Sequence, residues 1–135
     1  MTMTVVPRAG ASGFGLTVRA AKDYSKGKEL RVEPGERRFR YTEAPQGAPA
    51  RILAPNNAWQ LSWDQRTPYQ LEDVDGLDRP FELDVIVKDN ILDVCIDNRR
   101  TLYHRGLKGY EGDNLVFFVG AGEVEFKDIV VRHPE

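Results

Sequence analysis

The segment 81–132 constrains the fold more than any other part of the sequence, because short alternating runs follow one another there with turns between them. Apolar residues occupy every second position of 81–87, 92–96 and 115–119, which is the period of a half-buried β-strand. An Asp-Asn pair at 97–98 separates two strand candidates, and short Asx side chains tolerate the left-handed backbone of tight turns. The segment therefore predicts consecutive antiparallel strands joined by hairpins.

Alternation of the same kind extends back to 14–20, 30–32 and 39–41, with a Pro-Gly turn at 34–35. No window shows a sustained helical period. About ten strand candidates at spacings of about ten residues predict an all-β fold, a two-sheet antiparallel β-sandwich of the concanavalin or jelly-roll type with essentially no helix. At this length we expect a single domain over residues 1–135.

The final strand changes phase along its length. Val124 and Phe126 lie on one parity, whereas Ile129 and Val131 lie on the other. One extra residue between them restores the inward direction, so we predict a β-bulge at 127–128, in the Lys-Asp pair.

Composition excludes several classes of partner. Lys and Arg number 19 against 21 Asp and Glu, a net charge of −2, and the two signs are interleaved, which does not suit nucleic acid. No apolar run reaches the roughly 18 residues of a membrane helix. We expect a soluble chain without an export signal, cytoplasmic if Met1 is the native start and otherwise of unknown location. Cys95 lies in an apolar run and is expected to be a small buried hydrophobe.

Chemistry that depends on a metal or a cofactor is not indicated. His104 and His133 are isolated from each other and from Cys95, so no zinc spacing is present. The acidic loop 72–76 lacks the full ligand spacing of a calcium loop, and no G-x-S-x-G motif presents a nucleophile. We expect no metal and no cofactor.

A pair of carboxylates is the remaining catalytic alternative. Two acids at a suitable separation are enough for glycoside hydrolysis. The candidate acids are Asp64, Glu72, Asp84, Asp93 and Asp97. Any acidic β domain offers as many, so a small glycosidase is the less favoured alternative.

Two groups of side chains suit sugar binding. Aromatic rings cover the apolar C–H faces of sugars, while carboxylate and guanidinium groups hydrogen-bond the hydroxyls. The first group is Trp59, Trp63, Asp64, Arg66 and Tyr69, and the second is Asp97, Arg99, Arg100 and Tyr103. Trp59 and Trp63 share a strand face, for which a place in the core is the favoured interpretation. The second group fits turn chemistry and a polar strand face at least as well.

Two blocks of the sequence resemble the C-terminal β-sandwich domain of family 32 glycoside hydrolases, the invertase, inulinase and levanase group. The block 13–41 carries an R-A turn after its first strand, a Gly-containing loop and an E-P-G turn. The block 83–132 carries a D-V-C-I-D-N hairpin and a terminal G-E-V-E-F-K-D-I-V-V strand. The resemblance implies a concanavalin-like sandwich that accompanies a catalytic propeller.

The catalytic blocks of that family are absent from this sequence. The family's nucleophile block is similar to W-x-N-D-P-N, but here Trp63 and Asp64 are followed by Gln-Arg. The family's R-D-P block is matched only by Asp-Arg-Pro at 78–80, with the first two residues exchanged, and its E-C block is not matched because Cys95 follows Val94. The resemblance therefore implies a module that is not an enzyme by itself. Its expected partner is an oligosaccharide or fructan-like glycan. The alternative is a structural module that packs against a catalytic domain or a second copy of itself.

Overall fold

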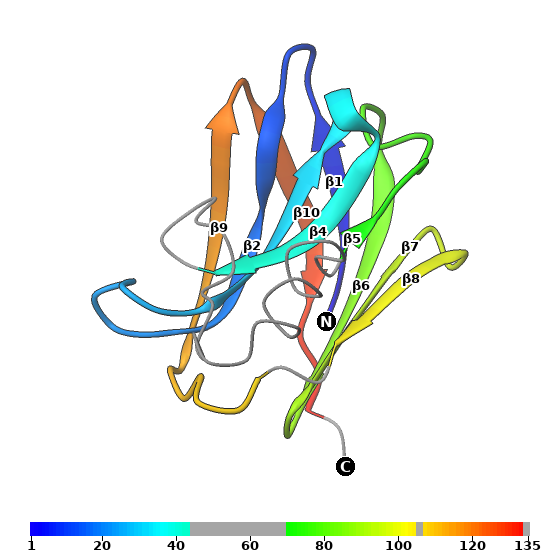
Figure 1. Ribbon diagram of the computed structural model, residues 1–135. Coiled ribbons are helices and arrows are strands. Elements are labelled where there is room, and N and C mark those ends of the chain that lie inside the picture. Colours follow the sequence, from blue (N-terminus) through cyan, green and yellow to red (C-terminus); the bar gives the residue numbers. More distant parts are fainter. Residues whose placement is uncertain (44–69, 105–106, 134–135) are drawn as a thin grey trace, which may run out of the picture.

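The computed structural model of the chain describes residues 1–43, 70–104 and 107–133. Within these residues ten strands form two five-stranded antiparallel sheets that face each other (Figure 1). Sheet A has the order β10-β1-β6-β7-β8 and sheet B the order β5-β4-β3-β2-β9. The predicted all-β sandwich is confirmed. The described part of the chain contains no helix long and apolar enough to cross a membrane.

The strand bounds follow the alternating runs of the sequence. Sheet A consists of β1 (Thr2–Pro7), β6 (Phe81–Lys88), β7 (Ile91–Ile96), β8 (Arg100–His104) and β10 (Val124–Val130). Sheet B consists of β2 (Ser12–Ala20), β3 (Lys28–Glu33), β4 (Arg38–Glu43), β5 (Gln70–Leu71) and β9 (Asn114–Ala121). One 3-10 turn, η1 (Pro34–Glu36), joins β3 to β4.

The core lies between the sheets and takes one parity of each strand. Leu16, Leu30 and Phe39 enter it from sheet B, and Leu83 and Leu92 enter it from sheet A, all at most 2% exposed. Burial of a side chain of this size stabilises the fold by roughly 1.5–3 kcal/mol. The opposite parity of every strand is left for the two outer faces.

The first strand of the structure precedes the first one predicted. β1 lies inside sheet A, paired with β10 on one side and β6 on the other. Met3 and Val5 enter the core at 1% exposed, and the amine of Met1 donates to the carbonyl oxygen of Val85 at 2.8 Å. The alternation of Met3 and Val5 has no turn residue before it, so the sequence did not predict this strand.

The predicted bulge in β10 is confirmed. Thr2 lies opposite Val130 and Thr4 opposite Lys127, so β10 holds one extra residue, and Asp128 has a φ of 54°. The expected return of the final residues to the core is wrong, because Ile129 is 41% exposed and Val131 is 65% exposed. β10 is an edge strand, and its end has a strand neighbour on one side only.

The expectation of a buried Cys95 is also wrong. Val94 and Ile96 take the inward parity of β7. Cys95 therefore lies on the outer face of sheet A, half-buried between Asp84 and Thr101 of the neighbouring strands. Because Val94, Cys95 and Ile96 are all apolar, the sequence alone did not show which of them faces the core.

Candidate functional site

The first predicted group of sugar-binding residues lies outside the described part of the chain. Its members are Trp59, Trp63, Asp64, Arg66 and Tyr69. The strands at either end of this stretch are described. β4 ends at Glu43, and β5 begins at Gln70, which pairs with Arg40. The stretch is therefore joined at both ends to sheet B.

The second predicted group begins at the turn between β7 and β8. Asp97 and Asn98 have φ values of 52° and 56°, the left-handed pair of a tight hairpin. Asp97 Oδ1 accepts a hydrogen bond from the backbone N–H of Glu82 at 2.9 Å. Arg99 Nη2 lies 3.8 Å from Asp97 Oδ2 in an exposed pair, which contributes little to stability. Asp97 thus holds the turn against β6.

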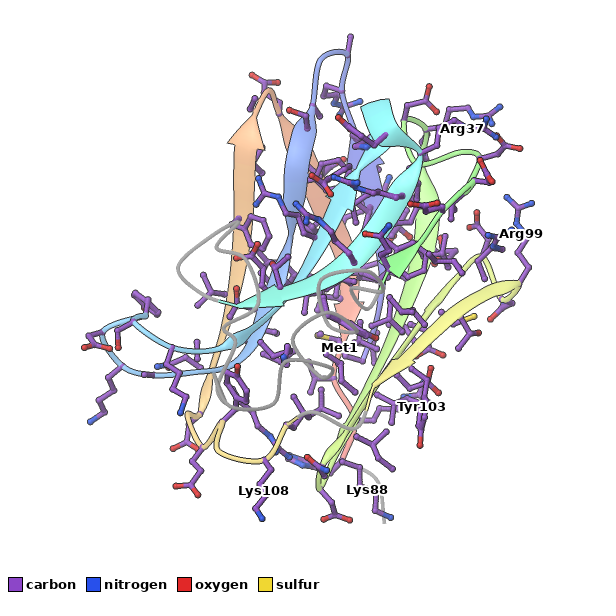
Figure 2. The ribbon with its side chains drawn as sticks, viewed as in Figure 1. Met1, Arg37, Lys88, Arg99, Tyr103 and Lys108 are labelled. Carbon is purple, nitrogen blue, oxygen red and sulfur yellow. The ribbon has the colours of Figure 1, made fainter. Side chains whose placement is uncertain are left out.

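The other two members of this group face opposite sides of β8. Arg100 pairs with Ile96, which takes the core parity, and its Nη2 donates to the carbonyl oxygen of Glu72 at 2.9 Å. Tyr103 pairs with Asp93 on the outer face and is 46% exposed. Figure 2 shows Arg99 at the turn and Tyr103 farther along the strand. The group does not share one surface, and sugar binding by its members stays a prediction.

The described carboxylates among the catalytic candidates lie mainly on sheet A. Asp84 and Asp93 are on its outer face, opposite Cys95 and Ile86 respectively, and Glu72 follows β5. No group of three or more His, Cys, Asp or Glu side chains in the described residues is arranged to hold a metal ion.

A cluster of charged side chains that the sequence did not single out as a site lies on the outer face of sheet B. Its members alternate with the inward-facing Leu30, Val32 and Phe39 along β3 and β4. We call this cluster the Arg–Glu face; it consists of Glu29, Arg31, Glu33, Arg38 and Arg40. In the sequence the only sign of this cluster is that charged residues alternate with apolar ones along the two strands, and an ordinary solvated strand face shows the same pattern.

Glu33 is the centre of the Arg–Glu face. Its Oε1 accepts from Arg38 Nε at 2.8 Å and from Arg40 Nε at 2.6 Å, and its Oε2 accepts from Arg40 Nη2 at 3.2 Å. Arg31 Nε lies 3.9 Å from Oε2. Burial alone raises the pKa of Glu33, but the hydrogen bonds from Arg38 and Arg40 outweigh it and hold the pKa below its usual value. One ionised carboxylate therefore fixes the guanidinium groups of Arg38 and Arg40 and forms an ion pair with a third, that of Arg31.

Glu29 extends the cluster into the protein. Its side chain is fully buried, and its Oε1 accepts from Thr42 Oγ1 at 2.9 Å and from Arg31 Nη1 at 3.3 Å. A buried carboxylate is costly without such hydrogen bonds. Arg31 thus spans Glu29 and Glu33 and is held along the strand.

Two glycines of β2, Gly13 and Gly15, lie next to Arg31. A Cβ at Gly13 would collide with Arg31 Nη2, so the missing side chain lets the guanidinium lie against the strand. Gly15 lies between Arg31 on β3 and Phe118 on β9. The Arg31 Cζ is 5.7 Å from the centre of the Phe118 ring, a cation–π contact. The face combines hydrogen-bond donors, carboxylate acceptors and an aromatic ring.

Comparison with solved structures supports the fold, whereas comparison by sequence finds no match. No family model matches the chain, and no curated protein matches it. A solved structure does match. It is the carbohydrate-binding module CBM66 from Bacillus subtilis, with a TM-score of 0.59 and 12% identity over 93% of this chain and 69% of that chain. A likeness at this identity establishes the β-sandwich fold, and the resemblance to family 32 glycoside hydrolases stays a prediction.

Proposed function

We propose that the chain is a non-catalytic β-sandwich module that binds carbohydrate on the Arg–Glu face. The observation that carries the proposal is the fixed array of Arg31, Arg38 and Arg40 around Glu33, beside the ring of Phe118. Guanidinium and carboxylate groups hydrogen-bond sugar hydroxyls, and charge-assisted bonds are the stronger kind. Because the ion pairs already hold these groups in place, binding a sugar costs little further ordering.

The similar structure supports the same function. The module from Bacillus subtilis is named as carbohydrate-binding. One fold hosts many functions, so the Arg–Glu face carries the proposal and the likeness adds to it. The sugar would be held without covalent chemistry.

Two finer points belong to the proposal. The ligand is an oligosaccharide of the fructan kind, and the module works beside the catalytic domain of a glycoside hydrolase, as the resemblance in 13–41 and 83–132 implies. Trp59, Trp63 and Tyr69 would add rings for sugar stacking, since their stretch is joined to β4 and β5 of sheet B.

Isothermal titration against levan, inulin, sucrose and a panel of plant glycans tests the proposal. We expect Arg40→Gln to weaken binding at least about tenfold, because a charge-assisted hydrogen bond contributes that much or more. Arg8→Gln is the matched control, since Arg8 is exposed and lies 3.7 Å from Glu125 on the other sheet. Silence across the whole panel, or equal affinities of the two variants, would overturn sugar binding on this face.

Exposed apolar side chains favour a second candidate, a module that packs against a partner domain or a second copy. Leu115, Val119, Ile129, Val130 and Val131 are 38–65% exposed on or next to the edge strands β9 and β10. The rings of Phe117 and Phe126, 4.8 Å apart, bring the two strands together. Interaction surfaces are rich in exposed apolar side chains when these form one contiguous patch. Sedimentation at several concentrations tests this candidate, and a monomer throughout excludes self-association.

A further inference from the structure

A hollow separate from the Arg–Glu face lies at one end of the sandwich. It is lined by residues at the ends of β2 and β6, at the start of β9 and after β10. Its volume is about 260 Å³, and Val18, Val85 and Leu115 give it an aliphatic lining. It shares no residue with the cluster around Glu33.

A bulge in β2 brings Arg19 to this hollow. Thr17 lies opposite Val116 and Ala20 opposite Asn114, so β2 holds one more residue than β9 between these pairs. Arg19 has a φ of 50°, a backbone conformation that residues other than glycine rarely adopt. Bulges re-aim side chains in this way. Arg19 is half-buried and lines the hollow.

Among the described residues that line the hollow, positive charge is in excess. Arg19 and Arg132 both line it, and in the part of the chain that the structure describes neither forms an ion pair. Asp113 is the one carboxylate among the lining residues that the structure describes. A half-buried arginine that has no ion pair with residues 1–43, 70–104 or 107–133 can bind an anion, and carboxylate is one of the groups that its planar guanidinium fits.

We propose that the hollow binds a small sugar acid, one ring with a carboxylate, such as a terminal uronic acid. The volume lies just below the usual range of about 300–1,000 Å³ for ligand pockets, which suits a single ring. Arg19 and Arg132 pair with the carboxylate, Asn114 and His133 hydrogen-bond hydroxyls, and the valine lining covers the C–H face of the ring. This site is additional to the one on sheet B.

A pair of ligands that differ in one group tests the chemistry. Methyl glucuronide and methyl glucoside, titrated by NMR against the full chain, differ only by a carboxylate in place of a hydroxymethyl group. We expect the glucuronide to bind at least about tenfold more tightly. Equal affinities, or no binding of either, overturn the proposal. Inorganic phosphate is the third arm, and binding as tight as that of the glucuronide would show a general anion site and overturn recognition of the sugar.

Variants separate this site from the one on sheet B. Arg19→Asn removes one positive charge and introduces a residue that tolerates positive φ. Arg132→Gln removes the other positive charge at an exposed position. Each should weaken glucuronide binding at least about tenfold, whereas Arg79→Gln, which is exposed elsewhere, should not. Unchanged affinity in Arg132→Gln, the variant that leaves the strands untouched, overturns the proposal. Arg40→Gln should leave glucuronide binding intact, so failure of the sheet B proposal is distinguishable.

Discussion

Replacing Glu33 by glutamine tests whether the Arg–Glu face is built around one carboxylate. The change keeps the shape of the side chain and removes the charge that Arg38 and Arg40 contact at 2.6–3.2 Å through three hydrogen bonds. It also turns an amide N–H₂ toward guanidinium donors, so at least one hydrogen bond is lost. Three arginines then lie close together without their shared counter-ion.

The expected cost of Glu33→Gln lies between two limits. Exposed ion pairs contribute about 0.2–1 kcal/mol, and removing one partner of a fully buried pair costs about 3–5 kcal/mol. The side chains of Glu33, Arg38 and Arg40 are 15–27% exposed, which places the loss of unfolding free energy at about 2 kcal/mol at pH 7. With a slope of about 2 kcal/mol per molar urea, the unfolding midpoint should fall by about 1 M.

The pH dependence of that loss has a definite sign. The pKa of Glu33 is lowered in the folded state, so its contribution is complete above the unfolded pKa of 4.5 and disappears as the pH falls through the lower folded value. Urea unfolding of wild type and Glu33→Gln at pH 7 and at pH 3 should show the gap closing at acid pH. Glu36→Gln, which removes an exposed charge nearby, should change stability by less than about 0.5 kcal/mol. A Glu33→Gln effect as small as that control at pH 7, or one equally large at both pH values, refutes the reasoning.

Three further changes probe the sheets. Gly15→Ala would place its Cβ against the carbonyl oxygen of Leu30, so we expect loss of folding or a cost above about 3 kcal/mol by circular dichroism melting, whereas Gly35→Ala, with no atom within 4 Å, should fold normally. Leu92→Ala, at 0% exposed, should cost about 3 kcal/mol in urea unfolding, and a cost below about 1 kcal/mol would contradict its place in the core. Asp128→Gly should raise the melting temperature slightly, because glycine adopts the φ of 54° without strain; a clear loss of stability would show that the Asp side chain supports the bulge.

The strands that could be predicted from the sequence are those in which alternating apolar residues are bounded by turn residues on both sides. Segments such as β6 and β7 meet this condition, and the bulge in β10 could be predicted from the phase change of the same alternation. β1 and the two-residue β5 do not, because their identity depends on partners far along the chain.

In the candidate sites, too, features that depend on neighbouring residues could be predicted from the sequence, whereas features that depend on distant strands could not. The left-handed turn at Asp97 follows from the residue type. The cluster around Glu33 requires the register between β3 and β4, which sets Arg31 opposite Arg40. The direction of Arg19 requires a second bulge, between β2 and β9, that leaves no mark in the alternation. Pairing register, rather than composition, decides which polar side chains meet.

The position of β1 has a consequence for how the protein is made. β2, β3 and β4 follow one another along the chain and can pair as they leave the ribosome, but β1 needs β6 and β10, and Thr2 can meet Val130 only after all the other described strands have been made. Pairing between distant strands is slow, and an unpaired strand invites aggregation in the meantime. β1, the first of the described strands in chain order, is thus among the last of them to be covered, and we expect the yield of native protein to depend on how long Met3 and Val5 stay shielded by chaperones.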